Sequence, residues 1–233
     1  MNSGNSRTDN VYFAHRRLAD ADIYFVNNHS ERNFNDKICL RTSYTQAEYW
    51  NPVDGKRYRL PILSTEEEAL TLMLHLVSNE SGFIVASNRL AKEELPVWSS
   101  SVNEQVKPIE GEWNVSFDPK WGGPGTVVFK EPTDWIQHTD PHIKYYSGTA
   151  AYEKNIELEK PATDEQILIR FNGLSFMARV WLNEKEVSTV WCSPWEANLT
   201  PYIQHGENKL KIEVVNSLMN RMIGDASLPT SQR

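Results

Sequence analysis

The sequence predicts an all-β protein composed of two antiparallel β-sandwich domains. Three observations lead to this prediction. Short runs of alternating apolar and polar residues recur along the 233-residue chain, turn residues separate these runs, and no segment has the pattern of a long amphipathic helix. Strands at such spacing, joined by short turns, are typical of sandwiches rather than of a parallel sheet. The chain is long enough for two domains of ordinary size.

The first half begins with a strand predicted at residues 22–26. The segment 51–55 (NPVDG) predicts a hairpin turn, because proline presets one turn torsion and Asp-Gly supplies a positive φ. One return strand is predicted over residues 56–63. Further on, Leu70, Leu72, Leu74 and Leu76 alternate with other residues, which is the period of a strand and not of a helix.

The second half is separated from the first by a polar stretch at residues 87–110, which contains Pro96 and Pro108. Trp98 is expected to anchor this stretch. We therefore divide the chain into a flexible leader (1–10), a first sandwich (11–95), a linker (96–107) and a second sandwich (108–233). Strands of the second sandwich are predicted at residues 113–117, 125–130, 149–158, 166–171, 178–182 and 209–215.

Charge and hydropathy argue against two classes of partner. The net charge is −7, whereas nucleic acids and anionic membrane surfaces attract basic patches. No apolar run approaches the ~20 residues that span a bilayer, and the polar N-terminus lacks the apolar core of a secretory signal. The composition suits neutral ligands, with neither nucleic acid nor membrane as partner.

The supply of aromatic residues, with eight Trp and nine Tyr, points to sugar contact. An aromatic ring stacks on the C–H face of a sugar, and a few polar groups nearby then fix its hydroxyls. The candidate platforms are Trp121, which lies between turn residues, the pair Trp191 and Trp195, and Trp135. The alternative is that these rings pack a sandwich core or an interface.

Catalytic and metal chemistry have weaker support. Hydrolysis of a glycoside needs two carboxyl groups about 5 to 9.5 Å apart. The nearest candidates, Asp118, Glu131, Asp134 and Asp140, are better explained as loop caps or solvated charges. His138, Asp140 and His142 would share one face of a strand and are weak metal candidates, but Pro141 interrupts that strand. We assign no catalytic residue, no metal and no cofactor.

Several strings in the second half resemble the sugar-binding jelly roll of family 2 glycoside hydrolases, which has the galactose-binding-like fold. The resemblance is carried by a strand that ends in V-W-L-N and by a G-x-N-x-L turn before the last long strand. These strings are residues 149–152 (TAAY), 178–183 (ARVWLN) and 199–210 (LTPYIQHGENKL).

Longer strings resemble the region that follows the catalytic barrel in family 106 α-L-rhamnosidases, and they occur in the same order from about Val11 onward. They are residues 15–17 (HRR), 21–28 (ADIYFVNN), 113–125 (WNVSFDPKWGGPG), 134–135 (DW), 144–150 (KYYSGTA), 190–195 (VWCSPW) and 214–225 (VVNSLMNRMIGD).

The resemblance implies an accessory, sugar-contacting role in an enzyme that acts on plant-type polysaccharides. The family's acid and base carboxylates lie upstream in a barrel that this chain does not encode, so the chain alone is expected to be inactive. Its expected partners are rhamnose-containing oligosaccharides and the missing barrel, in the same or a neighbouring chain.

The family also continues beyond residues 228–229 to a closing strand, so we expect the second sandwich to be truncated. Members of this bacterial family are expected in the periplasm or outside the cell, although the chain itself does not indicate its compartment. His15, Arg16 and Arg17, placed before the first predicted strand, are expected to pair with Asp20 and Asp22. The alternative function is a free-standing carbohydrate-binding module.

Overall fold

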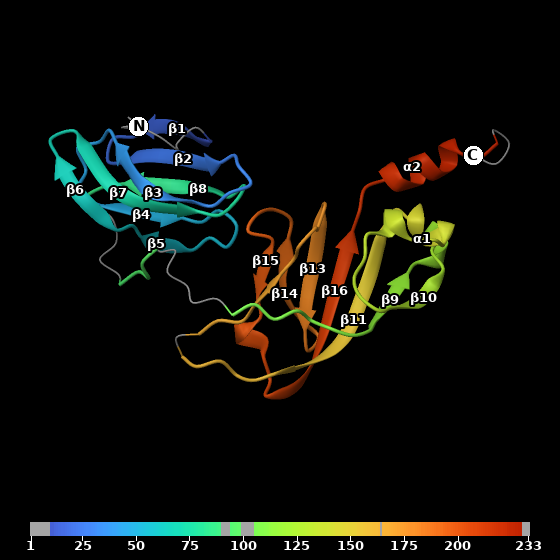
Figure 1. The fold of residues 1–233 in the computed structure, drawn as a ribbon. Coiled ribbons are helices and arrows are strands. Elements are labelled where there is room, and N and C mark those ends of the chain that lie inside the picture. Colours follow the sequence, from blue (N-terminus) through green and yellow to red (C-terminus); the bar gives the residue numbers. More distant parts are fainter. Residues whose placement is uncertain (1–9, 90–93, 99–104, 164, 230–233) are drawn as a thin grey trace. The chain divides into compact units, whose positions relative to one another are not determined.

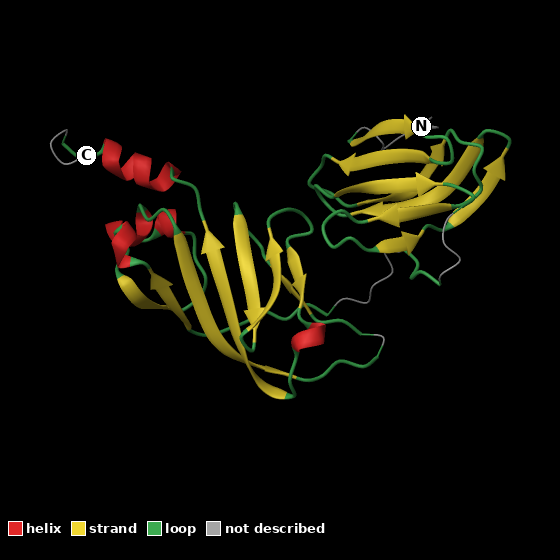
Figure 2. Ribbon diagram, turned by 180° about the vertical axis from the view of Figure 1, so that it is seen from behind, coloured by secondary structure: helices red, strands yellow, loops and turns green. Residues whose placement is uncertain are grey.

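The computed structural model describes residues 10–89, 94–98, 105–163 and 165–229. The chain divides into two compact units, Met1–Gln105 and Val106–Arg233. Antiparallel sheets dominate both units, and the predicted all-β sandwich class is confirmed (Figures 1 and 2). Of the predicted leader, only Asn10 is among the described residues. No helix in the described ranges is long and apolar enough to cross a bilayer.

The first unit contains a five-stranded sheet of order β1-β2-β8-β4-β5 and a three-stranded sheet of order β3-β7-β6. The strands are Val11–Arg17 (β1), Asp22–Asn28 (β2), Phe34–Leu40 (β3), Ala47–Trp50 (β4), Arg57–Arg59 (β5), Ile62–Glu66 (β6), Ala69–Leu76 (β7) and Ser81–Ala86 (β8). The predicted hairpin at residues 51–55 joins β4 to β5, and Gly55 has a φ of 70°.

The core of the first unit lies between these sheets. Leu70, Leu72, Leu74 and Leu76 point into it from β7 and are fully buried, as the alternation predicted. Large rings from the other sheet, above all Tyr24 and Tyr49, complete this core. Burying one such leucine contributes roughly 1.5–3 kcal/mol, so the four alternating leucines are a main source of stability.

The first strand among the described residues is β1 and not the segment 22–26, so residues 15–17 do not precede the first strand, as was predicted, but form part of it. Among the residues that the structure describes, β1 lies at the edge of its sheet and pairs with β2 alone. Most of its side chains are exposed. An edge strand with little buried surface need not show the apolar alternation by which strands are recognised.

The predicted return strand at 56–63 is divided into two strands that belong to different sheets. β5 ends at Arg59 in the larger sheet, and β6 begins at Ile62 in the smaller one. Pro61 lies between them and has no backbone N–H for a ladder, which explains why pairing cannot continue through this point.

Trp98 anchors the segment 94–98 to the first unit, as expected. Its ring stacks on Tyr49 with the ring centroids 4.1 Å apart and meets Tyr58 edge to face at 4.8 Å. Its indole N–H donates to the carbonyl oxygen of His75 over 2.7 Å. The contacts of this residue of the predicted linker are therefore with the first unit.

The second unit contains a six-stranded sheet of order β10-β9-β11-β16-β13-β14 and a two-stranded sheet, β12-β15. The strands are Trp113–Phe117 (β9), Gly125–Phe129 (β10), Thr149–Leu158 (β11), Leu168–Arg170 (β12), Met177–Leu182 (β13), Lys185–Val190 (β14), Glu196–Asn198 (β15) and Gly206–Val215 (β16). Inward residues such as Val115, Val180 and Leu210 are fully buried in its core.

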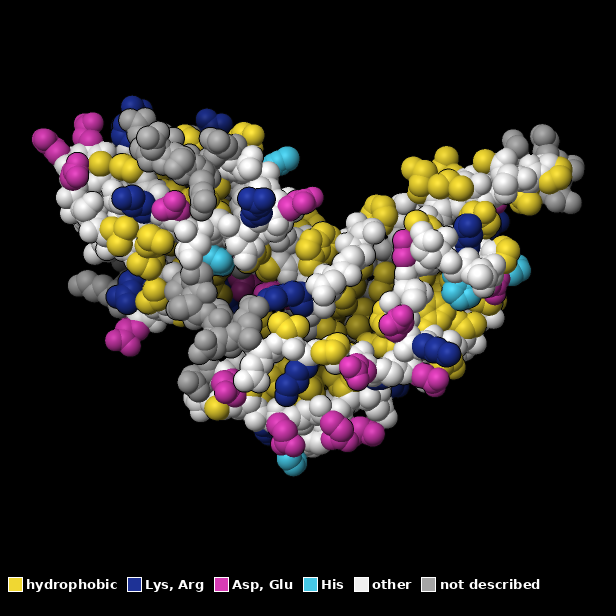
Figure 3. Space-filling model, in the orientation of Figure 1, with side chains coloured by type: hydrophobic (Ala, Val, Ile, Leu, Met, Phe, Trp, Pro, Cys, Tyr) yellow, Lys and Arg dark blue, Asp and Glu magenta, His cyan; other side chains and the backbone are white. Residues whose placement is uncertain are grey.

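Short helices join the strands of the second unit, and the sequence pattern did not predict them. They are η1 (Pro119–Trp121), η2 (Trp135–Gln137), α1 (Pro141–Lys144), η3 (Thr200–Tyr202) and α2 (Met219–Ala226). α2 packs through Gly224 close to Tyr145, while Met219, Met222 and Ile223 are 57–64% exposed and form an apolar surface (Figure 3). No side chain caps its N-terminus, so the usual start signal is missing.

Candidate functional site

The strand register gathers five connecting segments at one end of the six-stranded sheet. Thr149 and Met177 both pair with Val215, Ala150 pairs with Phe117, and Ala178 pairs with Val190. We call this end, where β9, β14 and β16 finish and β10, β11 and β13 begin, the loop end. Its connecting segments are residues 118–124, 145–148, 171–176, 191–195 and 216–218.

Trp121 is held at the loop end by a rigid turn. Asp118 caps η1 by accepting from the backbone N–H of Lys120 over 2.9 Å, and Gly122 closes the turn with a φ of 82°. A Cβ at Gly123 would lie 2.6 Å from the Cβ of Phe117, so the turn is packed directly on the core. The Trp121 side chain is 62% exposed. A fixed turn thus presents an open aromatic ring.

Tyr146 connects this turn to β11. Its hydroxyl accepts from the backbone N–H of Asp118 over 3.2 Å and donates to the carbonyl oxygen of Thr149 over 3.0 Å. Burial raises the pKa of Tyr146. The hydroxyl therefore stays protonated near neutral pH and keeps its donor role.

Two polar side chains approach the Trp121 turn from other segments. Nη1 of Arg221, in α2, lies 3.1 Å from the point that a Cβ would occupy if Gly122 had a side chain. His142 of α1 places Nδ1 3.3 Å from the Gly122 carbonyl oxygen. We call Trp121, His142 and Arg221 the Trp121 cluster. It combines an open ring with hydrogen-bonding groups, which is the combination that sugar sites use.

Arg221 is itself fixed in place. Its backbone N–H donates to the Ser147 hydroxyl over 2.9 Å, and its Nε lies 3.1 and 3.2 Å from the two carboxylate oxygens of Asp225. Sequence reasoning did not select Arg221. The signal was present as an Arg and an Asp four residues apart within the string 214–225, a spacing at which two side chains meet on a helix.

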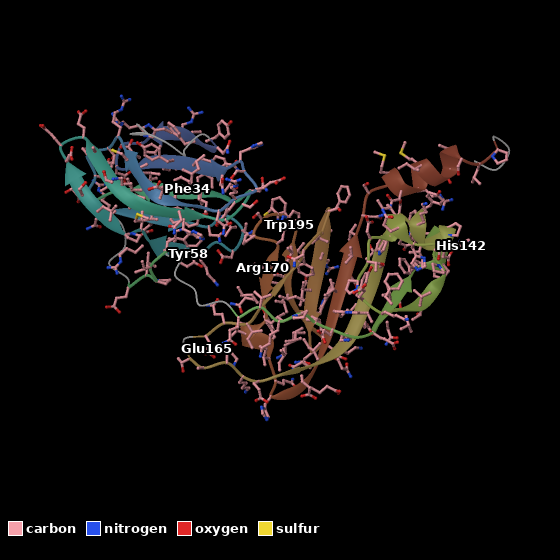
Figure 4. The ribbon with its side chains drawn as sticks, in the orientation of Figure 1. Phe34, Tyr58, His142, Glu165, Arg170 and Trp195 are labelled. Atoms are coloured by element: carbon pink, nitrogen blue, oxygen red, sulfur yellow. The ribbon has the colours of Figure 1, made fainter. Side chains whose placement is uncertain are left out.

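Trp191 and Trp195 lie at the same end of the sheet as Trp121, but near its opposite edge, after β14. Trp191 is 61% exposed, whereas Trp195 is half-buried against the core and has a φ of 24°. Three strands lie between β9 and β14. Four steps of about 4.8 Å therefore place β9 and β14 about 19 Å apart. Figure 4 shows Trp195 and His142 at opposite edges of the sheet. The four predicted tryptophans therefore do not form one site.

Trp135 is a core residue. Its side chain is 7% exposed, and its indole N–H donates to the Tyr152 hydroxyl over 2.6 Å. Its ring also packs against Phe117 and Tyr146. Because no ring face is open, Trp135 is not part of the Trp121 cluster.

Three of the four acidic candidates act as caps, and the fourth, Glu131, is exposed. Asp118, Asp134 and Asp140 each accept from a backbone N–H two residues later and begin η1, η2 and α1. His138 accepts from the Asp140 N–H through Nδ1 and stacks on Phe129. Within the described ranges, no group of three or more His, Cys, Asp or Glu side chains is placed to hold a metal ion.

Comparison with known proteins identifies two families along the chain. The family model described as "Glycosyl hydrolases family 2, sugar binding domain" matches residues 86–228. The model described as alpha-L-rhamnosidase matches residues 1–62. The strings at the loop end all lie within the first match.

Individual relatives are much longer than this chain. The solved structure of a rhamnosidase from Novosphingobium sp. PP1Y is similar with a TM-score of 0.83 and 26% identity, over 96% of this chain and 21% of that one. A Formosa agariphila protein named "Putative beta-glucuronidase" is 34% identical over 137 residues, 57% of this chain and 12% of that protein. A beta-galactosidase of Clostridium acetobutylicum is 34% identical over 86 residues, 34% of this chain and 10% of that one.

Proposed function

This chain belongs to the family of the glycosyl hydrolase family 2 sugar binding domain, and we propose that it is the accessory, sugar-contacting region of an α-L-rhamnosidase-like enzyme. The observation that carries the proposal is the Trp121 cluster, in which Trp121 is exposed on a tight turn and Arg221 and His142 both approach Gly122, the next residue of that turn. Both sandwich units match α-L-rhamnosidase-like or sugar-binding families, which supports a role beside a catalytic domain.

The proposed ligand is a rhamnose-containing oligosaccharide. In this arrangement the Trp121 ring covers the C–H face of one sugar, and Arg221 and His142 bind its hydroxyls. Stacking needs the apolar ring face, and hydroxyl recognition needs groups already held in position, because ordering flexible side chains on binding costs free energy. Asp225 supplies that order to the Arg221 guanidinium, and Ser147 holds the Arg221 backbone.

Removal of the Trp121 ring is the test of this site. We expect Trp121→Ala to weaken binding of L-rhamnose at least tenfold in isothermal titration calorimetry, which corresponds to about 1.4 kcal/mol. Trp191→Ala is the matched control, since its ring is equally exposed at the other side of the same end. Unchanged affinity in Trp121→Ala, or a loss confined to Trp191→Ala, would contradict the assignment.

A second expectation concerns glycoside hydrolysis by this chain alone. Asp118, Asp134 and Asp140 are engaged as helix caps, and hydrolysis of a glycoside needs two carboxyl groups facing each other across the bond. We therefore expect the purified chain to release no rhamnose from a synthetic α-L-rhamnoside. The assay compares the release rate with that of a heat-killed sample, and a rate above this background in several independent preparations would show that the chain is catalytic.

A further inference from the structure

The solvent face of the six-stranded sheet carries a row of four cross-strand neighbours. Glu153 of β11 pairs with Asn114 of β9 on one side and with Lys211 of β16 on the other. Lys211 in turn pairs with Trp181 of β13. We call these four residues, in the order Asn114, Glu153, Lys211 and Trp181, the outer row.

The outer row faces away from the core. The next row along the strands consists of Val115, Tyr152, Ile212 and Val180, which are at most 6% exposed. Since successive side chains of a strand point to opposite faces, the outer row lies on the solvent side. The side chains of Glu153 and Lys211 are 40% and 35% exposed.

One end of the outer row is aromatic. The guanidinium carbon of Arg179 lies 4.7 Å from the Trp181 ring centroid, and Nζ of Lys211 lies 4.9 Å from it. Glu213 approaches both cations, at 3.7 Å from Arg179 and 2.8 Å from Lys211. Contacts between cations and a ring hold the indole in one orientation. The ring is therefore positioned before any ligand arrives.

The other end of the outer row is a polar hollow of about 420 Å³, lined by Glu112, Asn114, Glu153, Lys154, Asn155 and Lys209. Lys154 donates to the carbonyl oxygen of Glu112 over 3.0 Å, and Lys209 lies 3.5 Å from the Glu153 carboxylate. Two carboxylates and two ammonium groups leave no net charge. The hollow suits hydroxyl groups, which both donate and accept hydrogen bonds.

We propose that the outer row is a second carbohydrate-binding surface, and that its ligand is a neutral oligosaccharide lying across the strands. Three steps between neighbouring strands place Asn114, at the far side of the hollow, about 14 Å from Trp181, which is longer than one sugar ring. The balanced charge excludes an attraction for anionic chains. A sugar ring contacts the Trp181 indole at one end, and hydroxyls of another sugar enter the hollow at the other end.

This surface is separate from the Trp121 cluster, and ligand length distinguishes the two. The probes are L-rhamnose and a linear trisaccharide of α-L-rhamnose, titrated calorimetrically into Trp121→Ala and into the double variant Trp121→Ala with Trp181→Ala. We expect the first variant to bind the trisaccharide at least tenfold more tightly than L-rhamnose, and the double variant to lose this preference. The pair Asn114→Ala and Asn155→Ala, made in the Trp121→Ala background, tests the hollow without touching the aromatic end.

Thr189→Ala is the control, because Thr189 is exposed on the neighbouring strand β14 and lies outside the outer row. Trisaccharide binding that is absent in Trp121→Ala, or that survives both Trp181→Ala and the double asparagine change, overturns the outer row. If Trp121→Ala leaves L-rhamnose affinity unchanged while Trp181→Ala removes the length preference, the loop-end site fails and the outer row stands.

Discussion

Asn208→Ala is expected to destabilise the second unit by at least about 3 kcal/mol. Asn208 is fully buried and uses all of its side-chain groups. Its oxygen accepts from the side-chain amide of Asn183 and from the backbone N–H of Gln204, each over 2.8 Å. Its amide donates to the carbonyl oxygens of Gln204 and Gly206 over 2.7 and 2.8 Å. Each buried group left without a partner costs about 1–3 kcal/mol.

The partner asparagine explains why the effect should be large. Asn183 closes the β13–β14 turn with a φ of 52°, and its side-chain oxygen accepts from the Lys209 N–H over 3.0 Å. The two asparagines therefore fasten this turn to the beginning of β16. They are the Asn of the V-W-L-N strand and the Asn of the G-x-N-x-L turn, so both motifs have a structural role.

Thermal unfolding of the intact chain measures this effect. The unfolding temperature of Asn208→Ala should fall by about 10 °C or more, with faster hydrogen exchange in peptides of the second unit. Asn155→Ala is the matched control, because it removes an exposed asparagine of the adjacent strand β11 and should stay within about 0.5 kcal/mol. A change of less than 2 °C in Asn208→Ala would contradict the role of this network.

Asp22→Ala is expected to destabilise the first unit by roughly 3 kcal/mol. The Asp22 carboxylate is 2% exposed and accepts from the Thr42 hydroxyl over 2.7 Å. His15 Nε2 lies 2.7 Å from it, and Arg17 Nε donates to it over 3.1 Å. These contacts join β1 to β2 and to the segment after β3. Faster hydrogen exchange in peptides that cover β1 and β2 would locate the loss, and unchanged exchange there would contradict it.

The same carboxylate gives the first unit a defined dependence on pH. Burial by itself raises the pKa of Asp22, but hydrogen bonds from Thr42, His15 and Arg17 outweigh it and lower the pKa below the usual 3.8. A carboxyl whose pKa is lower in the folded state stabilises the fold above its unfolded pKa, and this stability is lost as pH falls through the folded pKa.

Asp22→Asn isolates this contribution, because it keeps the size of the side chain and removes the titration. The difference in unfolding free energy between the natural chain and Asp22→Asn should shrink as the pH falls below about 4. Asp36→Asn is the control, since Asp36 is exposed on β3. A difference that stays constant down to pH 2 would contradict the lowered pKa.

Local pattern predicted much of the fold. The alternating leucines of β7 and the hairpin at 51–55 follow from strand period and turn chemistry, and the family strings correctly indicated both matching families. Edge strand β1 was missed because little of its surface is buried. β14 and β15 were missed as well, since they are short or partly exposed and lack clear alternation.

The candidate site could be predicted only in part. Trp121 was selected from its turn. The approach of Arg221 to Gly122 in that turn joins residues far apart in the sequence, and only the register of β9, β11 and β16 brings them together. Sequence reasoning selected both Trp121 and Trp135 as candidate platforms. Their burial differs because η2 directs one ring into the core while η1 leaves the other open.

The most direct test of sugar contact at the loop end is a two-dimensional ¹H–¹⁵N NMR titration of the intact chain with L-rhamnose. We expect amide signals to shift in residues 118–123 and around His142 and Arg221, while signals of the first unit stay in place. Shifts confined to the first unit, or no shift at a rhamnose concentration of tens of millimolar, well above the ~1 mM of a weak complex, would contradict the Trp121 cluster as a sugar site.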